Sequence, residues 1–283
     1  MVATALHTQP DDLDLATFNR LASFIYDYAG IKMPANKVTM LEGRLRRRLR
    51  DTGIDTFREY CEFLFSPAGE DERVHFIDAV TTNKTDFFRE PQHFEILTKR
   101  VLPEFAREGH RDIRVWSSAC STGAEPYTLA MVLEEAVAGR QIDSYSILAT
   151  DLSTEVLDQA LRGIYDADFL APVPKDLASK YVMWPIAKIR PERRISPRLR
   201  QRIAFARMNL MDESYLVGHA MHVIFCRNVL IYFDKQTQTK VLHRLCDRLA
   251  PGGHLFIGHS ESIAGMNLPV RQIANTVFRK NER

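Results

Sequence analysis

From about Asp112 onward, short and almost wholly apolar runs alternate with segments of helical periodicity, and this alternation limits the fold more than any other feature. Nearly continuous apolar runs are typical of parallel strands that are buried on both faces. The pattern therefore predicts an α/β domain with a mostly parallel sheet covered by helices on both faces. Strands are expected at 113–116, 145–150, 203–206, 221–226 and 254–258, with a last run near Val277, and helices at 125–138, 154–161 and 235–249.

The first part of the chain has only helical patterns. Apolar residues recur at helical spacing from Leu13 to Tyr28, with Asp12 or Asp14 as the expected N-cap and Gly30 at the end. Further helices are expected at about 36–52, 55–65 and 70–80. The sequence thus predicts an all-α N-terminal domain over 1–82, a linker and first helix over 83–110, and the α/β domain over 111–283. Within the latter, residues 168–202 are rich in proline, lack glycine and are basic towards their end, which indicates an inserted subdomain.

Charge and cysteine usage narrow the class of protein. The formal net charge is only +2, so any electrostatic signal must lie in local clusters. The four cysteines show no CxxC spacing, which argues against a disulfide framework or a zinc site and favours a reducing compartment. The N-terminus lacks the features of a secretory signal, and the longest nearly apolar run, 221–233, is too short to cross a bilayer. We therefore expect a cytoplasmic protein without membrane insertion.

Ligands of parallel sheets bind at the carboxyl ends of the strands, so the residues after each strand are the candidates for a site. The first strand runs into VWSSACSTGAEPYTLA, where small side chains at 117–123 allow a ligand to approach the backbone. Gly123 is the only glycine there, so the GxGxxG pattern of a dinucleotide site is missing and an NAD-linked oxidoreductase is disfavoured. Glu125 would repel phosphate and attract a cation. The alternative is a plain turn in which Glu125 is a first-turn residue favoured by the helix dipole.

Polar side chains also follow the other strands. Asp151 is placed to bind ribose hydroxyls, although it can equally serve as a helix N-cap. Asn209 and Leu210 can contact the edge and the face of an adenine, although a turn asparagine is the simpler explanation. Arg227 and Asn228 interrupt an apolar run, and burying them is costly unless they have partners, which favours a functional site. Two acids without a phosphate-binding loop favour a nucleoside with a positively charged tail, and S-adenosylmethionine fits this description.

The segment TTNKTDFFREPQHF, residues 81–94, lies between the two predicted domains. It can be a linker whose Phe87 and Phe88 simply dock. It is also rich in hydrogen-bonding groups. If it folds over the carboxyl ends of the strands, Asn83, Thr85 and Arg89 would face a ligand.

Five segments in order, TTNKTDFFREPQHF, SSACSTGAEPYTLA, ATDLSTEVL, FCRNVLIYFD and GHSES, closely resemble the motifs of the chemotaxis receptor methyltransferases, the CheR family. The resemblance covers about Leu13 to Lys280. It implies an all-α N-terminal domain and a Rossmann-like S-adenosylmethionine domain that carries a small antiparallel β subdomain. It also implies the reaction, in which glutamate side chains on the cytoplasmic helices of chemoreceptors become methyl esters and the donor becomes S-adenosylhomocysteine.

The resemblance also implies site residues. Arg89 and Tyr232 match residues considered to take part at the substrate site of the family. No metal or general base is expected, because a glutamate with a pKa of about 4.3 is already an ionised nucleophile at neutral pH. The family's cofactor contacts match Asn83, Thr85, Arg89, Glu125, Asp151, Asn209, Leu210, Arg227 and Asn228.

A basic helix gives a candidate surface for the receptor. Its arginines are suited to attract the glutamates of the methylation helices, although a solvated charged face is the ordinary alternative. Some family members hold a receptor tether peptide through a glycine-containing loop of the β subdomain, and the lack of glycine between Gly163 and Gly218 predicts that this chain does not need it. We expect a monomer recruited from the cytoplasm to receptor arrays. The candidate partner-binding arginines are Arg44, Arg46, Arg47, Arg48 and Arg50.

Three other functions fit parts of the sequence. A nucleic-acid methyltransferase is supported by the two basic stretches, but the fourth strand does not end in an Asn/Asp–Pro–Pro–aromatic run and Cys226 lacks a Pro–Cys context. A non-catalytic nucleoside-binding module would keep the same fold, and an activity assay separates it from an enzyme. His259, Ser260 and Glu261 match a catalytic triad in letters only, because adjacent residues cannot converge as nucleophile, base and orienting acid.

Overall fold

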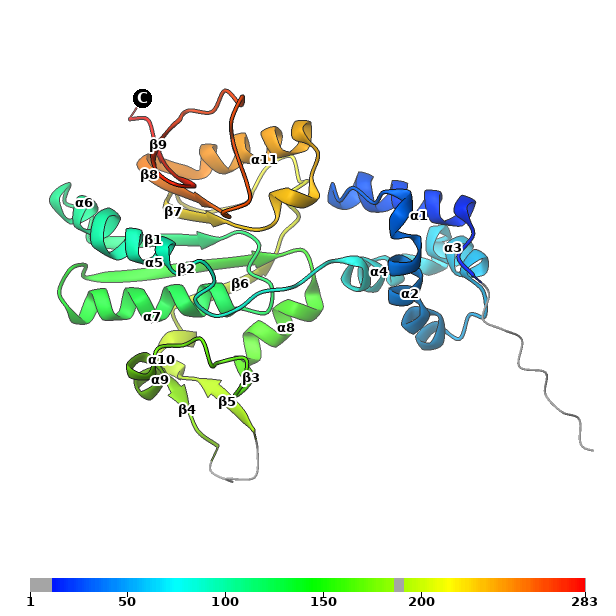
Figure 1. Ribbon diagram of the computed structural model, residues 1–283, viewed down its shortest axis with the longest axis horizontal. Helices are drawn as coiled ribbons and strands as arrows, with labels where there is room; N and C mark the ends of the chain where they lie inside the picture. Colours follow the sequence, from blue (N-terminus) through cyan, green and yellow to red (C-terminus); the bar gives the residue numbers. More distant parts are fainter. Residues whose placement is uncertain (1–11, 186–190, 283) are drawn as a thin grey trace, which may run out of the picture. The chain divides into compact units, whose positions relative to one another are not determined.

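A sheet with the strand order β6-β2-β1-β7-β8-β10-β9 is the centre of the α/β part of the chain (Figure 1). The computed structural model describes residues 12–185 and 191–282, so part of the predicted basic stretch, including Lys188 and Arg190, lies outside the described residues. Neighbouring strands from β6 to β8 are parallel, and β10 and β9 add an antiparallel edge. The strands are β1 Asp112–Ser117, β2 Ser144–Asp151, β6 Ile203–Arg207, β7 Met221–Cys226, β8 Leu249–Ile257, β9 Val270–Ala274 and β10 Val277–Lys280.

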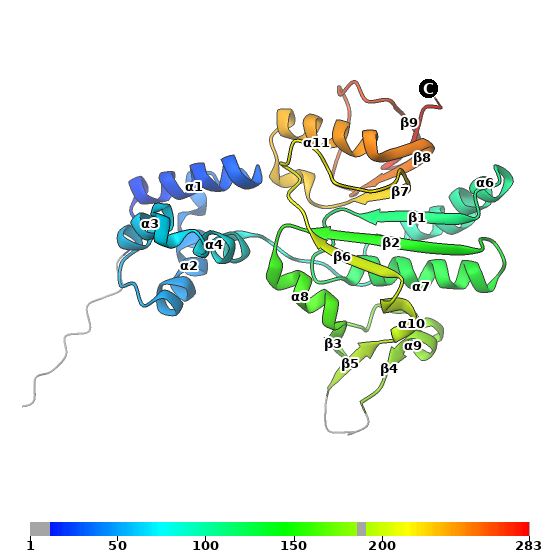
Figure 2. The same cartoon turned by 180° about the vertical axis from the view of Figure 1, so that it is seen from behind.

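Helices cover both faces of this sheet, as the two opposite views show (Figures 1 and 2). The prediction of a mostly parallel sheet between helical layers is therefore confirmed. Every residue of β7 is buried, which explains why its sequence is an unbroken apolar run. The helices of this unit are α5 Gln92–Ile96, the π-helical turn η3 Leu97–Val101, α6 Leu102–Arg107, α7 Ala124–Ala138, α8 Thr154–Arg162, the 3-10 turn η4 Leu230–Tyr232 and α11 Lys235–Arg248.

The strand order reverses between β1 and β7. From β1 the chain proceeds to β2 and β6 on one side, whereas β7 and β8 lie on the other. At such a reversal the loops after the two strands turn in opposite directions and leave a place for a ligand at the carboxyl edge. Ser117 is the last residue of β1 and pairs with Phe225 of β7, so these two strands end at nearly the same level.

A small antiparallel sheet in the order β3-β5-β4 follows α8. It begins at Ile164, ahead of the insertion expected over 168–202, and its strands are too short to show an alternation in the sequence. Three side chains fasten this subdomain to α7: Arg198 contacts Glu134 at 2.6 Å, and Lys180 and Tyr181 each contact Glu135 at 2.6 Å. Its elements are β3 Ile164–Asp166, α9 Lys175–Tyr181, β4 Val182–Met183, β5 Glu192–Ile195 and α10 Pro197–Arg200.

The chain forms a separate helical unit up to Thr82, and the α/β unit begins at Asn83. Asp14 is the N-cap of the first helix, where its carboxylate accepts a hydrogen bond of 2.7 Å from the Thr17 N–H, and Gly30 ends that helix with a φ of 70°. The helices are α1 Leu15–Ala29, η1 Ala35–Lys37, α2 Val38–Thr52, α3 Phe57–Phe65, η2 Pro67–Gly69 and α4 Glu72–Val80. Among the helices at 12–185 and 191–282, none combines the length and the apolar character that crossing a bilayer requires.

Two buried histidines of the sheet make stability depend on pH. Burial, and after it the charges of neighbouring arginines, lower the pKa of His222 to about 4 and that of His254 to about 3. Both are neutral in the folded chain, whereas in the unfolded chain they take up protons below a pKa of about 6.5. Stability should therefore fall as the pH drops from about 6.5 towards 4, by at most about 1.4 kcal/mol per pH unit for each histidine.

Urea unfolding of the full chain at several pH values between 7.5 and 5 measures this effect. His222→Asn should reduce the pH dependence, whereas His243→Asn, on an exposed position of the same unit, should leave it unchanged. A free energy of unfolding that stays constant over this range would contradict the prediction.

Candidate functional site

The loop after β1 lies across the ends of two neighbouring strands. The Ser118 N–H donates to the Phe225 carbonyl at the end of β7, and the Cys120 N–H donates to the Thr150 carbonyl near the end of β2, both at 2.9 Å. The loop then turns through Gly123, whose φ of 94° requires glycine. A Cβ atom at Gly123 would lie 2.8 Å from the Tyr165 hydroxyl, so its lack of bulk serves packing against the small sheet.

Asp151, at the end of β2, is held by this loop. Its Oδ2 accepts a hydrogen bond of 2.8 Å from the Ser121 N–H and its Oδ1 one of 3.1 Å from the Ser153 N–H. The N-cap of α8 is Ser153, whose hydroxyl accepts from the Val156 N–H. The alternative that Asp151 caps this helix is therefore wrong, and its half-buried carboxylate stands fixed at the carboxyl edge of the sheet.

Glu125, in the first turn of α7, is mostly buried and pairs with an arginine of the chain itself. The Ser117 hydroxyl donates to Glu125 Oε1 at 2.7 Å, and Arg227 Nη1 donates to Oε2 at 2.9 Å. Burial raises the pKa of Glu125, and the hydrogen bonds and the positive charge beside it oppose that shift. The cation beside Glu125 in this structure is the Arg227 guanidinium, and a contact of Glu125 with a cationic ligand stays a prediction.

Arg227 follows β7 and is buried between two carboxylates. Besides Glu125 it binds Glu90, with 2.9 Å between Arg227 Nη2 and Glu90 Oε2, and it donates to the Arg89 carbonyl. The Asn228 side chain donates to Glu90 Oε1 at 3.1 Å. Burial alone would raise the pKa of Glu90, but the Arg227 charge and the hydrogen bonds from Arg227 and Asn228 lower it to about 2.

The backbone at this site is strained. Glu90, Asn228 and Ser121 are among the few non-glycine residues with positive φ, at 57°, 58° and 50°. Such conformations persist where the surrounding contacts fix them, and they are frequent at ligand sites. The contacts of Glu90 with Arg227 and Asn228 supply this fixation here.

Glu261 organises the loop that carries Arg227 and Asn228. Its buried carboxylate accepts backbone hydrogen bonds from Gly258 at 2.6 Å, Leu230 at 2.8 Å and Asn228 at 3.0 Å. Burial raises its pKa, and these hydrogen bonds oppose the shift. Glu261 binds backbone N–H groups, whereas His259 lies beside Glu90, so these two residues do not form a catalytic triad with Ser260.

The segment before α5 lies beside the loop after β1. The Ser121 hydroxyl donates to the Asn83 carbonyl at 2.7 Å, and the Phe88 N–H donates to the Thr128 hydroxyl at 3.2 Å. Phe87 is buried, as the docking alternative expects. The docking of Phe87 agrees with the first hypothesis for 81–94, and the contact of Asn83 brings this segment to the loop after β1. That Asn83, Thr85 and Arg89 face a ligand stays a prediction.

The other predicted site residues make local contacts. Asn209 Oδ1 accepts from the Met211 N–H at 3.0 Å, which is the turn role that the alternative predicted, and the Leu210 carbonyl accepts from Tyr215 at 2.8 Å. Thr85 and Tyr232 are half-buried, and Tyr232 lies in η4 just after Arg227 and Asn228. Their contacts with a donor remain predictions.

The charges of this site fit a cationic nucleoside. Glu90 and Glu125 face one guanidinium, so one negative charge remains uncompensated if both acids are ionised. This charge suits a sulfonium group, and the fixed Asp151 carboxylate suits ribose hydroxyls. We infer that Asp151 would hold the nucleoside and that Glu125, Arg227 and Glu90 would set the potential around its tail.

Two glutamates of the site were not identified from the sequence. Glu90 and Glu261 contact Arg227 and the loop after β7 from positions far away in the chain. The sequence contains only an indirect signal for Glu90: a buried Arg227 needs an acidic partner, and Glu90 is an acid of the polar segment 81–94.

The arginines of α2 fall into two groups. Arg44 donates to the Val80 and Thr81 carbonyls at the end of α4, and Arg48 binds both oxygens of Glu72, which also accepts from Tyr60. These two stabilise the helical unit, so their predicted role in partner binding is not supported by their contacts. Arg46 pairs with Glu42, whereas Arg47 and Arg50 are exposed.

A doubly wound parallel sheet with acidic side chains at its carboxyl edge is the architecture of Rossmann-like nucleoside-binding domains. Comparison with known proteins identifies the family to which this domain belongs. The family model described as "CheR methyltransferase, SAM binding domain" matches residues 83–279, and "CheR methyltransferase, all-alpha domain" matches residues 16–81. The chain belongs to the CheR methyltransferase family and is an S-adenosylmethionine-dependent methyltransferase, which confirms the resemblance and the cofactor expected from the sequence.

Curated relatives cover nearly the whole chain. A chemotaxis protein methyltransferase of Salmonella typhimurium is 40% identical over 259 residues, which are 92% of this chain and 88% of the relative. That of Escherichia coli is 37% identical over 263 residues, 93% of this chain and 90% of the relative. That of Borreliella burgdorferi is 35% identical over 269 residues, 93% of each.

Proposed function

We propose that this protein transfers the methyl group of S-adenosylmethionine to glutamate side chains of chemoreceptors and forms methyl esters that adjust receptor signalling. The relatives named chemotaxis protein methyltransferase support the pathway. The observation that carries the proposal is the set of acids at the switch point, with Asp151 fixed by the loop after β1 and Arg227 held between Glu90 and Glu125.

The chemistry requires position more than proton transfer. When bound, the donor supplies a methyl group on a positively charged sulfur, which is a good leaving group. The receptor glutamate is already ionised at neutral pH, so it needs no general base. The chain must hold the carboxylate oxygen about 3 Å from the methyl carbon and in line with the sulfur.

Arg89 and Tyr232 are proposed to orient the receptor glutamate. Arg89 is half-buried, and its guanidinium donates to the Lys84 carbonyl at 3.0 Å. A single hydrogen bond from either side chain would leave one carboxylate oxygen available for attack. A bidentate Arg89 contact would hold both oxygens and would slow the transfer.

The receptor helices are proposed to dock on the exposed arginines of α2. Of the five predicted there, Arg47 and Arg50 present exposed side chains, and Arg46 is partly exposed beside Glu42. We propose further that the protein works as a cytoplasmic monomer recruited to receptor arrays, without need of a tether peptide. Tight binding of a receptor C-terminal peptide to the small sheet would contradict the last point.

The decisive assay uses a donor labelled in its methyl group together with receptor cytoplasmic domains. Label transferred to the receptor and released as volatile methanol by mild base indicates carboxyl esters, as the proposal expects. Base-stable label indicates N-methylation, and label in added DNA or RNA indicates a nucleic-acid methyltransferase. Donor binding without transfer to any of these would favour the non-catalytic module.

Reversal of two exposed charges tests the docking surface. Arg47→Glu combined with Arg50→Glu should lower the rate of receptor methylation on the order of tenfold at low salt, because electrostatic steering toward acidic helices is lost. The difference should shrink as salt screens these charges. Initial rates at two ionic strengths measure both effects.

The matched control is the pair Lys99→Glu and Arg107→Glu, which reverses two exposed charges of the α/β unit. Its methylation rate should stay near that of the wild type. Calorimetry should show unchanged binding of S-adenosylhomocysteine in both double variants. Equal rates for the α2 variant and the wild type at low salt would remove this surface from the proposal.

A further inference from the structure

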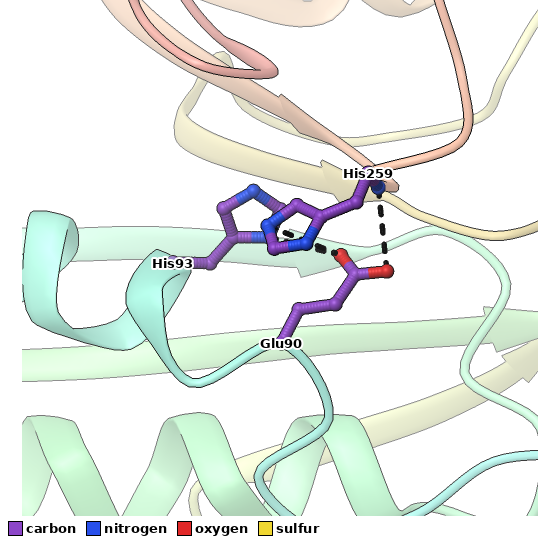
Figure 3. Close-up of side chains that lie close together, drawn as sticks. All are labelled: Glu90, His93 and His259. Carbon is purple, nitrogen blue, oxygen red and sulfur yellow. Dashed lines mark hydrogen bonds and ion pairs between the residues drawn. The ribbon is translucent and has the colours of Figure 1, made fainter.

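Two histidines converge around the Glu90 carboxylate that also binds Arg227. Glu90 lies just before α5, His93 is in its first turn, and His259 follows β8 (Figure 3). One carboxylate oxygen and two ring nitrogens of these residues all lie within 4.8 Å of one another. Neither the transfer chemistry nor the family match assigns this cluster a role.

The protonation of His93 follows from its neighbours. The Thr276 hydroxyl donates its single proton to the Asn275 carbonyl at 2.8 Å. With the Thr276 proton on Asn275, the contact of 2.8 Å between His93 Nε2 and Thr276 Oγ1 makes Nε2 the donor. Nδ1 then carries a lone pair, and it has no hydrogen-bond partner among the described residues although His93 is fully buried.

This lone pair faces a second acceptor. His93 Nδ1 lies 3.4 Å from Glu90 Oε2, and neither atom carries a proton for the other in this arrangement. A buried lone pair that faces a carboxylate oxygen is unfavourable unless a cation or a donor lies between the two atoms. The exposed His259 offers a third acceptor, with its Nε2 4.0 Å from the same Glu90 oxygen.

The spacing suits a tetrahedral ion. Zinc binds histidine nitrogen and carboxylate oxygen at about 2.0–2.2 Å, which places two ligand atoms roughly 3.4 Å apart. The His93–Glu90 pair already has this separation, and the partly exposed His259 side chain can approach by rotation. The hydrogen bond from His93 Nε2 to Thr276 orients the ring as the outer contacts of zinc-bound histidines commonly do.

The charges nearby permit a cation despite Arg227. Arg227 shares Glu90 Oε2, but Glu125 binds the same guanidinium from another side at 2.9 Å. Two carboxylates thus face one arginine, and the charge of Glu90 is not fully compensated. Asn228 and the His259 N–H bind the other oxygen of Glu90, so Oε2 is the oxygen that faces the two rings.

We propose that Glu90, His93 and His259 bind one zinc-class divalent metal ion, with water as the fourth ligand. Two neutral imidazoles and a carboxylate are a ligand set that zinc commonly takes. The ion would bind Glu90 Oε2, the oxygen that also accepts a hydrogen bond from Arg227. Its binding would therefore act on the same ion pair that shapes the donor site.

Titration of the metal-free full chain with ZnCl2 against a chromophoric chelator tests this proposal. The wild type should bind one zinc ion per chain. His259→Ala should weaken that binding by at least roughly tenfold, since loss of even an outer contact of a zinc ligand commonly costs 10–100-fold. His259 is exposed, so this variant is expected to fold.

His243→Ala is the matched control, because His243 is an exposed histidine on α11 of the same unit. Its zinc affinity should equal that of the wild type. Zinc affinity that is the same in His259→Ala and in the wild type would overturn the proposal, as would the absence of stoichiometric binding. Either result would mean that a proton or a water molecule separates His93 from Glu90.

Discussion

Replacement of Arg227 by methionine is expected to lower the free energy of unfolding of the α/β unit by roughly 3–5 kcal/mol, the usual effect of breaking a buried ion pair from one side. Arg227 is almost fully buried and is the shared partner of Glu90 and Glu125. Methionine preserves much of the volume but leaves two acids facing each other. Donor binding should be lost together with stability, because the potential of the site changes from one uncompensated negative charge to two.

A double variant separates charge from packing in this prediction. Adding Glu125→Gln to Arg227→Met removes one of the unpaired acids and should restore part of the lost stability. Arg107→Met, on an exposed position, should change the free energy of unfolding by less than about 0.5 kcal/mol. Urea unfolding at pH 7 measures all three. If Arg227→Met is as stable as the wild type, the ion pairs do not hold this site together.

Removal of the Glu261 side chain should have an effect of similar size. In Glu261→Ala the N–H groups of Gly258, Leu230 and Asn228 lose their acceptor, and each buried unsatisfied donor costs roughly 1–3 kcal/mol. The loop after β7 should then lose the fixed conformation that includes the positive φ of Asn228. Stability and methyl transfer should therefore fall together.

Glu213→Ala serves as the control for this variant, because Glu213 is an exposed acid of the same unit. Urea unfolding gives the stabilities, and amide hydrogen exchange of residues 226–232 reports on the loop. We expect faster exchange there in Glu261→Ala alone. An unchanged exchange rate, or a loss of stability below about 1 kcal/mol, would show that water replaces the carboxylate at little cost.

The sheet was predictable because its signals are local. Each parallel strand is a short apolar run, and the residue types that follow β2 and β7 include Asp151 and the Arg227–Asn228 pair. The rule that ligands bind at the carboxyl ends of parallel strands then places these side chains at one edge. The edge strand β9 was not predicted, because its residues are half-buried or exposed and form no continuous apolar run.

The contacts within the site were not predictable in the same way. Glu90 reaches Arg227, and Glu261 reaches the N–H groups of the loop after β7, across long stretches of chain that no local pattern records. The tautomer of His93 depends on Thr276, which lies still further along the sequence. The same holds for Arg48 in the helical unit. Its position at the edge of a basic helix face does not indicate that it pairs with Glu72.

The central claim is that the donor is held at the carboxyl edge of the sheet, with Asp151 on its ribose. Calorimetric titration of S-adenosylhomocysteine into the wild type and into Asp151→Ala tests it most directly, with Asp158→Ala, an exposed acid of α8, as the control. We expect one site per chain, an unchanged affinity in Asp158→Ala, and an affinity roughly 10–100-fold lower in Asp151→Ala, as the loss of hydrogen bonds to a charged group predicts. Equal affinities for Asp151→Ala and the wild type, or no binding heat with the wild type, would contradict this account.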